Sequence, residues 1–295
     1  MKIAFVILNY NTYEETRECV LSIEDKIDTR DYRIVIVDNC STDDSVDRLA
    51  ELIKGKSRAE LIRNPKNMGF ARGNNVGIAY VNQKYKPEYV AVCNSDTELV
   101  SEHLVFLLDK EYEKSGFALL GPLNTDRFGG CASSPLGVKS VEVCKEILAS
   151  LKKKDFMIKS GVYGIYDFFN KIKGRVVREF HKGNIPTGGN GFYKYQRQVI
   201  VHGCFLIFSK KAFDYIDGFD NRTFMYCEEN ILCLNLIKLN LVTVYSPEIV
   251  IYHKVGCSTR KAKSRKKKRM LFTNKCMIES YETELEILES LQKQN

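Results

Sequence analysis

Apolar runs and helical segments alternate along the first 120 residues, and this order limits the fold more than any other feature of the sequence. The predicted strands cover residues 3–8, 33–37, 60–63, 89–93 and 117–120, and residues 3–8 form a continuous apolar run. Continuous apolar runs are typical of strands buried on both faces. Helical crossovers join such strands in parallel, so the pattern predicts an α/β fold with a mostly parallel central sheet flanked by helices.

Capping residues mark the expected helix starts. The first helix is expected to begin at Asn11 or Thr12, and a second at a capping box over residues 41–44. Ser101 and Ser209 precede two further helical segments. Side-chain oxygens of these residue types accept hydrogen bonds from the free N–H groups of a first helical turn, so we predict that they serve as N-caps.

The alternation loosens after residue 121. Residues 122–198 contain two possible helices and a glycine-rich segment at 182–191. Runs at 199–208, 242–244 and 249–252 indicate further strands, and a helix is expected from Glu228 to Leu239. An amphipathic C-terminal helix is predicted because apolar residues recur there at three- and four-residue spacing, at Met277, Tyr281, Leu285, Leu288 and Leu291.

The composition argues against several classes of protein. A hydrophobic content of 44% over 295 residues suffices for a full core and argues against disorder. The chain has no run of about 18 apolar residues that would predict a membrane-spanning helix, and its N-terminus lacks the cleavage site of a signal peptide. Ten cysteines occur without CxxC pairs. That pattern favours reduced thiols in a cytoplasmic protein over a disulfide framework or a zinc knuckle.

One basic tract accounts for the net charge. Residues 260–269 carry eight Lys and Arg side chains, and the whole chain has a formal net charge of +8, so the remainder is near neutral. The tract is compatible with a solvated turn or with peripheral contact to an anionic membrane surface at the inner face of the cell membrane. It lacks interleaved aromatic residues, which argues against a nucleic-acid partner.

Polar residues follow each of the first four predicted strands. They lie at residues 9–11, 38–39, 64–69 and 94–96. Each segment alone is an ordinary turn, since Asn, Asp and Gly are common turn residues. Ligands of open parallel sheets bind beyond the carboxyl ends of the strands, however, so four such turns on one edge predict a ligand site there.

The first of these turns argues against a dinucleotide-binding oxidoreductase. That class needs the pattern GxGxxG after the first strand, so that the backbone can approach a pyrophosphate. Residues 9–14 (NYNTYE) contain no glycine, and Glu14 and Glu15 would repel a phosphate. A nucleotidyltransferase would need a Gly-rich loop bearing Arg or Lys at the same place, which is also missing.

Two groups of carboxylates are candidates for chemistry. Asp96 follows an apolar strand, where a carboxylate can hold Mg²⁺ or Mn²⁺ and leave positions open for phosphates. Glu228 and Glu229 stand at a predicted helix start after the apolar run 224–227. Helix N-termini favour carboxylates in any case. Repulsion between two neighbouring carboxylates would also raise one pKa toward the range of a general base.

Six blocks in a fixed order resemble the family 2 glycosyltransferases of the GT-A fold. They read ILNYN, VDNCSTDDS, NPKNMGFARGNN, VCNSDTE, the long block from VHGCF to LCLNL, and VYSPEIVIYHKVGCST, and they cover roughly residues 1–260. The resemblance is greatest to transferases of capsular polysaccharide and O-antigen assembly, including rhamnosyltransferases. It implies a GT-A domain at 1–259, with a nucleotide-sugar half at 1–121 and an acceptor half at 122–259. The basic tract and terminal helix at 260–295 follow it.

The resemblance also implies roles for single residues. Asp38 would bind the base of the nucleotide, beside Asn9 and Asn11 of the first turn. Asn94 and Asp96 occupy the ends of the DxD motif, with Asp96 the metal ligand and Asn94 in place of the first Asp. His253 would be a further metal ligand. Glu228 and Glu229 take the place of the family's Glu-Asp pair, and we expect Glu229 to be the base. The nucleotide and diphosphate would also contact Asn67, Gly69, Arg72 and Asn74, and Gly203 would form the acceptor-side floor.

These residues together predict a metal-dependent, inverting sugar transfer. The donor would be a nucleotide-diphosphate sugar, and the acceptor a glycan, expected to be lipid-linked, in surface polysaccharide assembly. The alternatives are a nucleotidyltransferase and a non-catalytic nucleotide-sugar-binding or scaffold protein. The substitution of Asn94 for an Asp keeps the second alternative open, because it removes one negative charge from the metal site.

Overall fold

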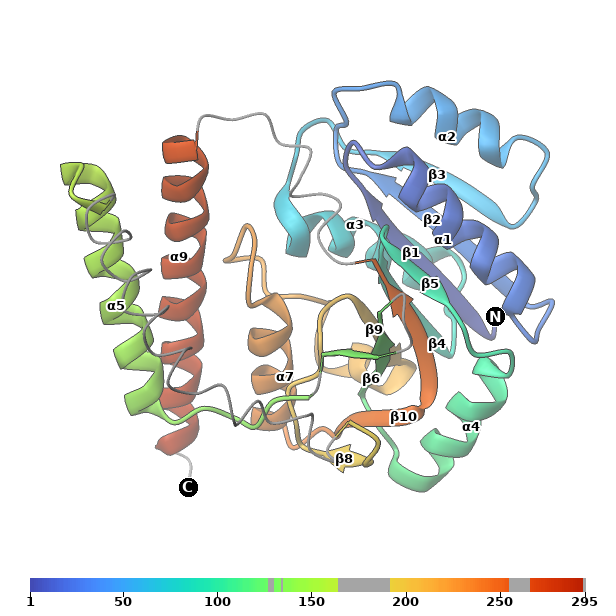
Figure 1. The fold of residues 1–295 in the computed structure, drawn as a ribbon. Helices are drawn as coiled ribbons and strands as arrows, with labels where there is room; N and C mark the ends of the chain where they lie inside the picture. The colour runs from blue at the N-terminus through green and yellow to red at the C-terminus, as the bar shows by residue number, and fades with distance from the viewer. Residues whose placement is uncertain (127–129, 134, 164–191, 255–265, 294–295) are drawn as a thin grey trace.

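One ten-stranded sheet runs through the computed structural model, which describes residues 1–126, 130–133, 135–163, 192–254 and 266–293 (Figure 1). The strand order is β3-β2-β1-β4-β9-β6-β10-β5, with β7 paired to β6 and β8 to β10. The strands are β1 (Ile3–Asn9), β2 (Tyr32–Asp38), β3 (Ala59–Arg63), β4 (Tyr89–Asn94), β5 (Thr97–Leu99), β6 (Leu119–Thr125), β7 (Cys131–Ser133), β8 (Gln196–Arg197), β9 (Phe205–Ser209) and β10 (Thr243–His253). The helices are α1 (Tyr13–Lys26), α2 (Ser45–Ile53), α3 (Gly69–Lys84), α4 (Leu104–Ser115), α5 (Val141–Ser160), the 3₁₀ helix η1 (Lys210–Asp214), α7 (Glu228–Lys238) and α9 (Lys266–Gln292).

The first four long strands form the parallel part of the sheet. β1 pairs in parallel with β2 and with β4, and β2 pairs in parallel with β3. The register sets Asn9 beside Asp38 and Leu8 beside Asn94. The carboxyl ends of β1, β2 and β4 therefore meet at one edge, as the order of the apolar runs predicts.

The second half of the sheet is mixed. β9 lies antiparallel between β4 and β6, whereas β10 is parallel to β6 and antiparallel to β5. The two strands expected at 242–244 and 249–252 are one strand, β10, with a register shift between Ser246 and Val250. Pro247 lies in this irregular stretch, where a residue without an N–H group is tolerated. The strand expected at 199–208 is shorter, because β9 begins only at Phe205.

Alternating residues of the central strands divide the core between the two faces of the sheet. Ile3, Phe5 and Ile7 of β1 pack in one cluster with apolar residues of α1, α2 and α4. Ala4 and Val6 pack on the other face with residues of α3 and α7. Strands with two buried faces need apolar side chains at consecutive positions, which explains the continuous runs in the sequence.

A third cluster holds the C-terminal helix. α9 packs against α5 and α7, and the two long helices α5 and α9 lie side by side in Figure 1. Met277, Tyr281, Leu285, Leu288 and Leu291 all belong to this cluster, as the predicted apolar stripe requires. The last four residues of the basic tract, Lys266–Arg269, form the start of α9, while residues 260–265 lie outside the described residues, as does the glycine-rich segment 182–191.

The residues predicted as N-caps do not make the expected hydrogen bonds to the first turns of the helices. Thr12 is at the N-cap of α1, but its hydroxyl donates to Asn9 Oδ1 at 3.2 Å and lies 3.0 Å from Ser95 Oγ. α2 begins at Ser45, after the expected box, and the Ser41 hydroxyl donates to Asp38 instead. The Ser41 hydroxyl also accepts from Asn9 Nδ2 at 3.0 Å. The contacts of Thr12 with Ser95 and of Ser41 with Asn9 join different strand ends, and they take the place of the local caps.

The start of α4 shows the same effect. Ser101 Oγ accepts a hydrogen bond from the Val250 N–H at 2.8 Å, and α4 begins only at Leu104. Its first-turn N–H groups, of Val105 and Phe106, donate to the carboxylate of Asp28 from the turn after α1. Ser209 precedes η1 but donates to the Phe117 carbonyl oxygen.

None of the helices in the described part of the chain is long and apolar enough to cross a membrane.

Candidate active site

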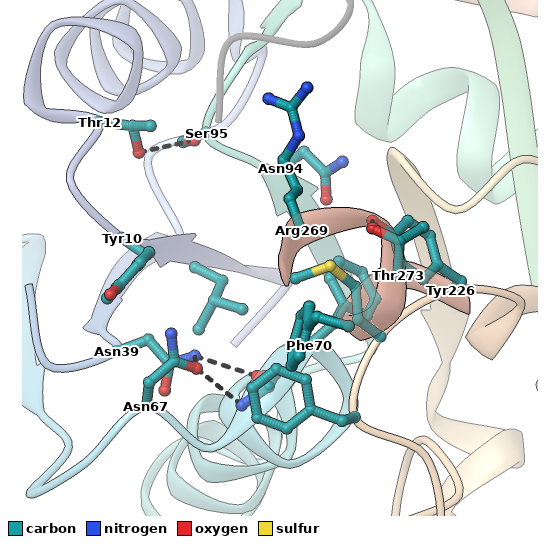
Figure 2. A pocket seen from close by; sticks show the side chains of 15 residues that line it. Tyr10, Thr12, Asn39, Asn67, Phe70, Asn94, Ser95, Tyr226, Arg269 and Thr273 are labelled. Atoms are coloured by element: carbon teal, nitrogen blue, oxygen red, sulfur yellow. Dashed lines mark hydrogen bonds between the residues drawn. The ribbon is translucent and has the colours of Figure 1, made fainter. Parts of the chain in front are cut away.

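A cavity of about 720 Å³ opens at the carboxyl ends of β1, β2 and β4 (Figure 2). Its walls come from three places: the strand ends, the start of α3 with the loop before α7, and the first turns of α9. The lining residues are Leu8, Tyr10, Thr12, Asn39, Asn67, Gly69, Phe70, Asn94, Ser95, Phe224, Met225, Tyr226, Arg269, Phe272 and Thr273. Three of the predicted contact residues are among them: Asn67, Gly69 and Asn94.

Asn39 organises one wall of the cavity. Its Nδ2 donates to Asn67 Oδ1 at 3.1 Å and to the Gly69 carbonyl oxygen at 3.0 Å, as Figure 2 shows. Its Oδ1 accepts from the Met68 N–H at 3.0 Å. Gly69 has φ +82° and lies so close to Phe224 that a Cβ would sit 2.3 Å from the Phe224 carbonyl oxygen. Sequence reasoning placed Asn39 at a strand end but gave it no role in the site.

Asp38 and Asn9 lie behind the cavity wall. Both are buried, and Asn9 Nδ2 donates to Asp38 Oδ1 at 2.8 Å. The other carboxylate oxygen of Asp38 accepts from the Ser41 N–H at 3.0 Å. Asn11 has φ +56°, and its side chain accepts from the Thr42 N–H at 2.8 Å. These residues hold the turns after β1 and β2 together, and none of them lines the cavity.

Two more predicted contact residues also lie away from the lining. Arg72 Nε donates to the Asn221 carbonyl oxygen at 2.8 Å, which ties α3 to the loop before α7. Asn74 is fully buried and donates to the Phe70 carbonyl oxygen at 3.1 Å. These residues were predicted as contacts because the pattern RGNN follows Gly69 closely in the sequence. In the structure they lie further along α3 than Gly69 and Phe70, and they do not line the cavity.

Asp96 and His253 meet beside the cavity. Asp96 is buried, and its Oδ1 lies 3.4 Å from Nε2 of His253. The antiparallel pairing of β5 with β10 sets His253 opposite Thr97, the residue after Asp96. Asn94 and Ser95, the residues before Asp96, line the cavity. A carboxylate and an imidazole at this distance can both be ligands of one divalent metal ion.

His202 lies in the same place, and the sequence analysis missed it. Ligand atoms of His202, Cys204 and His253 lie within 4.8 Å of one another, and the two imidazole rings are 5.7 Å apart. His202 Nδ1 accepts from the Cys204 N–H at 3.3 Å. Desolvation by the surrounding atoms lowers the pKa of His202, and the neighbouring His253 lowers it further. This histidine was missed because residues 199–208 were predicted to be one strand. In the structure His202 lies in the loop before β9.

Glu228 and Glu229 begin α7 as predicted, after two residues with positive φ, Tyr226 and Cys227. Glu228 is buried, with Oε1 unpaired among the described residues, and burial raises its pKa to about 7, with a further increase from the charge of Glu229. Burial also raises the pKa of Glu229, and Glu284 adds to that shift. Glu229 faces Gly203, where a Cβ would lie 3.0 Å from Glu229 Oε2.

The first turns of α9 form the remaining wall of the cavity, which the sequence analysis did not predict. Phe272 packs edge-on against Phe224 at 5.7 Å between ring centroids. The hydroxyls of Tyr226 and Thr273 lie 3.4 Å apart. Arg269 extends from this helix in Figure 2 and is the single charged residue among those that line the cavity.

Comparison with known proteins gives the family of the N-terminal part. Residues 4–121 match the family model for glycosyl transferase family 2. The chain carries a family 2 glycosyltransferase domain. This domain covers β1 to the start of β6 and supplies most of the strand ends around the cavity.

The family 2 domain also has curated relatives among bacterial transferases. The chain is 27% identical over 188 residues to rhamnosyltransferase WbbL of Escherichia coli K12, an alignment that covers 63% of this chain and 60% of the relative. It is 25% identical over 213 residues to the GalNAc(5)-diNAcBac-PP-undecaprenol beta-1,3-glucosyltransferase of Campylobacter jejuni, covering 70% of this chain and 64% of that one. The chain thus spans less than two thirds of the length of both.

The solved structures support the predicted fold. Mannosyltransferase PcManGT from Pyrobaculum calidifontis, solved with GDP-Man and Mn²⁺, superposes with a TM-score of 0.54 at 12% identity. The superposition covers all of this chain and 76% of that protein. The predicted α/β class with the GT-A architecture and a C-terminal helix is confirmed, with a sheet that is mixed in its second half.

Proposed function

We propose that the protein is a glycosyltransferase that moves a sugar from a nucleotide-diphosphate donor to an acceptor hydroxyl. The observation that carries the proposal is the approach of Asp96 to His253, at 3.4 Å, directly behind the cavity residues Asn94 and Ser95. A cavity at the carboxyl ends of parallel strands is the place where open α/β sheets bind ligands. The family 2 domain supports the choice of reaction.

The donor fits the wall formed by the strand ends. Asn67, whose Oδ1 is held by the Asn39 amide, lines the cavity, and Tyr10 adds an aromatic side chain that is 39% exposed. Amides that hydrogen-bond and rings that stack are suited to a nucleotide base and its ribose. Residues 1–121 would then form the donor half and 122–259 the acceptor half, as the sequence analysis predicts. Asp38 and Asn9 act on the base indirectly, through the turns that they hold.

The residues around Asp96 fit a divalent cation, Mg²⁺ or Mn²⁺. Asp96 and His253 would hold the ion, and His202 and Cys204 have ligand atoms within 4.8 Å of that of His253. An imidazole beside a carboxylate suits Mn²⁺ better than Mg²⁺, which prefers oxygen ligands. When bound, the ion would stabilise negative charge on a departing nucleoside diphosphate. Asn94 lines the cavity and presents an amide where the family motif has a carboxylate.

Glu229 is suited to accept the proton of the acceptor. Its raised pKa and its position against Gly203 place a basic carboxylate near the start of β9. In a single displacement the acceptor oxygen bonds to the anomeric carbon and its proton passes to Glu229. The bond from that carbon to the diphosphate breaks, and its electron pair leaves with the nucleoside diphosphate. The configuration at the anomeric carbon is thereby inverted, without a covalent sugar intermediate.

The acceptor is proposed from the relatives. One of them is named for action on an undecaprenol-linked glycan, so a lipid-linked glycan is the first acceptor to test. Such an acceptor would bring the protein to an anionic membrane surface, and the basic residues 260–269 would favour that contact.

The proposal is tested by donor turnover. The protein is incubated with UDP-, GDP- and dTDP-sugars and Mn²⁺, and release of the nucleoside diphosphate is measured with and without a polyprenyl-diphosphate glycan. Metal-dependent release that EDTA abolishes, and that Asp96→Asn lacks, is the expected result. Binding of a nucleotide sugar with no turnover under any of these conditions would favour a non-catalytic binding protein.

A further inference from the structure

The inference concerns Arg269 and rests on the proposed function. The residues that line the cavity include amides, hydroxyls, aromatic rings and apolar side chains, and Arg269 is the one member with a full charge. Among the described residues that line the cavity there is no carboxylate. The charged group on the described lining is therefore a guanidinium, which favours an anionic ligand.

Arg269 is available to a ligand. The ion pairs among the described residues include Arg222 with Glu286 and Lys139 with Glu284 near α9, but none that contains Arg269. Its side chain is exposed, as are those of Lys267 and Lys268. Of these three cations in the first turn of α9, Arg269 alone lines the cavity.

The helix that carries Arg269 is fixed against the cavity. Phe272, one turn further along α9, packs on Phe224, whose carbonyl oxygen accepts from the Phe70 N–H at 2.8 Å. Thr273 lies against Tyr226 from the same loop. Deeper in the molecule Glu284 of α9 is fully buried and pairs with Lys139 at 2.9 Å. These contacts place the first turns of α9 over the strand ends rather than in solvent.

The opposite wall shows what Arg269 faces. Asn94 and Ser95 follow β4, and Figure 2 shows Arg269 extending from α9 toward the part of the cavity where they lie. Asp96 stands directly behind them, so a ligand that bridges Asp96 and Arg269 would need at least two groups of oxygens. A diphosphate has this chemistry, because a metal at Asp96 can take some of its oxygens while a guanidinium binds others through two N–H groups.

We propose that Arg269 binds the diphosphate of the donor, so that the basic tract ends in the active site. The C-terminal helix then completes a donor site whose other parts come from the first 96 residues. Arg269 serves as a positioning residue: it holds the diphosphate during binding and departure and takes no part in proton transfer. The family match ends at residue 121, so this assignment stems from the cavity and not from the family motifs.

The experiment compares Arg269→Gln with Lys268→Gln. Lys268 is the adjacent, exposed cation of α9 and does not line the cavity, so both variants lose one charge from the same turn. Titration calorimetry with Mn²⁺ present measures binding of UDP, GDP and dTDP, of the corresponding nucleosides, and of inorganic pyrophosphate. Circular dichroism and the melting temperature confirm that each variant is folded.

The expected result is specific to phosphate. Arg269→Gln weakens binding of the preferred nucleoside diphosphate and of pyrophosphate by about 10- to 100-fold, the loss typical of a hydrogen bond to a charged group. It leaves nucleoside binding unchanged, and Lys268→Gln changes each affinity by less than about twofold. Arg269→Lys recovers part of the loss, because Lys keeps the charge but not the paired N–H groups.

Three outcomes would overturn the inference. Equal losses in Arg269→Gln and Lys268→Gln would show a general effect of charge. Unchanged pyrophosphate and nucleotide affinity in Arg269→Gln would remove Arg269 from the site, while metal-dependent turnover would keep the proposed function. If the wild type binds neither pyrophosphate nor any nucleoside diphosphate, the inference is wrong. The protein could also bind pyrophosphate through Arg269 and yet turn over no donor. That result would support the anion site and refute the proposed function.

Discussion

Asp96 Oδ1 lies 3.4 Å from His253 Nε2, although 157 residues separate them in the chain. The contact arises because the short strand β5 turns back from the end of β4 and pairs with the end of β10. It joins the family 2 domain to the part of the chain that the family model does not cover. The proposed metal site would therefore depend on both halves of the sheet.

Loss of either residue is expected to remove metal binding. Asp96→Asn and His253→Ala should each weaken Mn²⁺ binding by at least about tenfold, because even partners of metal ligands contribute that much. Binding is measured by calorimetry or by the electron paramagnetic resonance signal of free Mn²⁺. His202→Ala should also weaken it, since its ligand atom lies with that of His253. His103→Ala, a histidine at the N-cap of α4, is the matched control. Unchanged Mn²⁺ affinity in Asp96→Asn and His253→Ala would contradict the site.

Glu229→Gln is expected to lower kcat by about 10²- to 10⁴-fold, the usual contribution of a positioned base. The amide keeps the shape of the side chain but accepts no proton, so binding of the donor should remain nearly intact. Glu228→Gln should lower kcat less, because Glu229 is the member of the pair that lies against Gly203, just before β9. Steady-state kinetics with donor and acceptor decide between them. A larger loss in Glu228→Gln would move the role of base to that residue, and near-normal turnover in the double variant would exclude the pair.

The pH dependence of stability should report on Glu228. Burial raises its pKa from the ordinary value of 4.5 to about 7, so the folded state binds the proton more tightly than the unfolded chain does. The stability that this proton supplies is present below pH 4.5 and is lost as the pH rises to 7. Glu228→Gln, which needs no proton, should therefore gain stability on the order of 3 kcal/mol over the wild type between pH 4.5 and 8.

Chemical denaturation at both pH values measures this gain. Glu113→Gln on the exposed surface of α4 provides the control and should show little change with pH. A stability difference between Glu228→Gln and wild type that stays constant from pH 4.5 to 8 would show that Glu228 titrates alike in the folded and unfolded protein, and would contradict its raised pKa.

Gly203→Ala should impair catalysis more than folding. The added Cβ would lie 3.0 Å from Oε2 and 3.3 Å from Cβ of Glu229, so the carboxylate must shift. A displacement of about 1 Å can cost up to about 10²-fold in rate, and a kcat lowered by roughly that factor is expected. Gly137→Ala is the control, since nothing lies within 4 Å of its added Cβ. If kcat of Gly203→Ala equals that of Gly137→Ala, the position of Glu229 does not limit the reaction.

The sequence determined the elements of the first half and the end of the chain. Strands buried on both faces require apolar runs, and these marked β1, β2, β4 and the start of β6 within one or two residues. β3, of sequence AELIR, is less buried, and its predicted range of 60–63 was also within one residue. Spacing of apolar residues likewise predicted α9. The order of these elements placed Asn9, Asp38 and Asn94 at one edge of the sheet, and the structure has them there.

Only the tertiary structure decided which side chains reach the cavity. Asp38 and Asn74 are polar residues beside predicted strand or helix ends, yet both point into the protein because hydrogen bonds to neighbouring elements hold them there. His202 and Arg269 carried no local signal that linked them to the strand ends. One depends on the antiparallel pairing of β9 with β4, and the other on the packing of α9 against α5 and α7. Such contacts join distant residues, 47 positions apart for Tyr226 and Thr273 and further apart for β4 and β9, and no pattern within a short stretch of sequence records them.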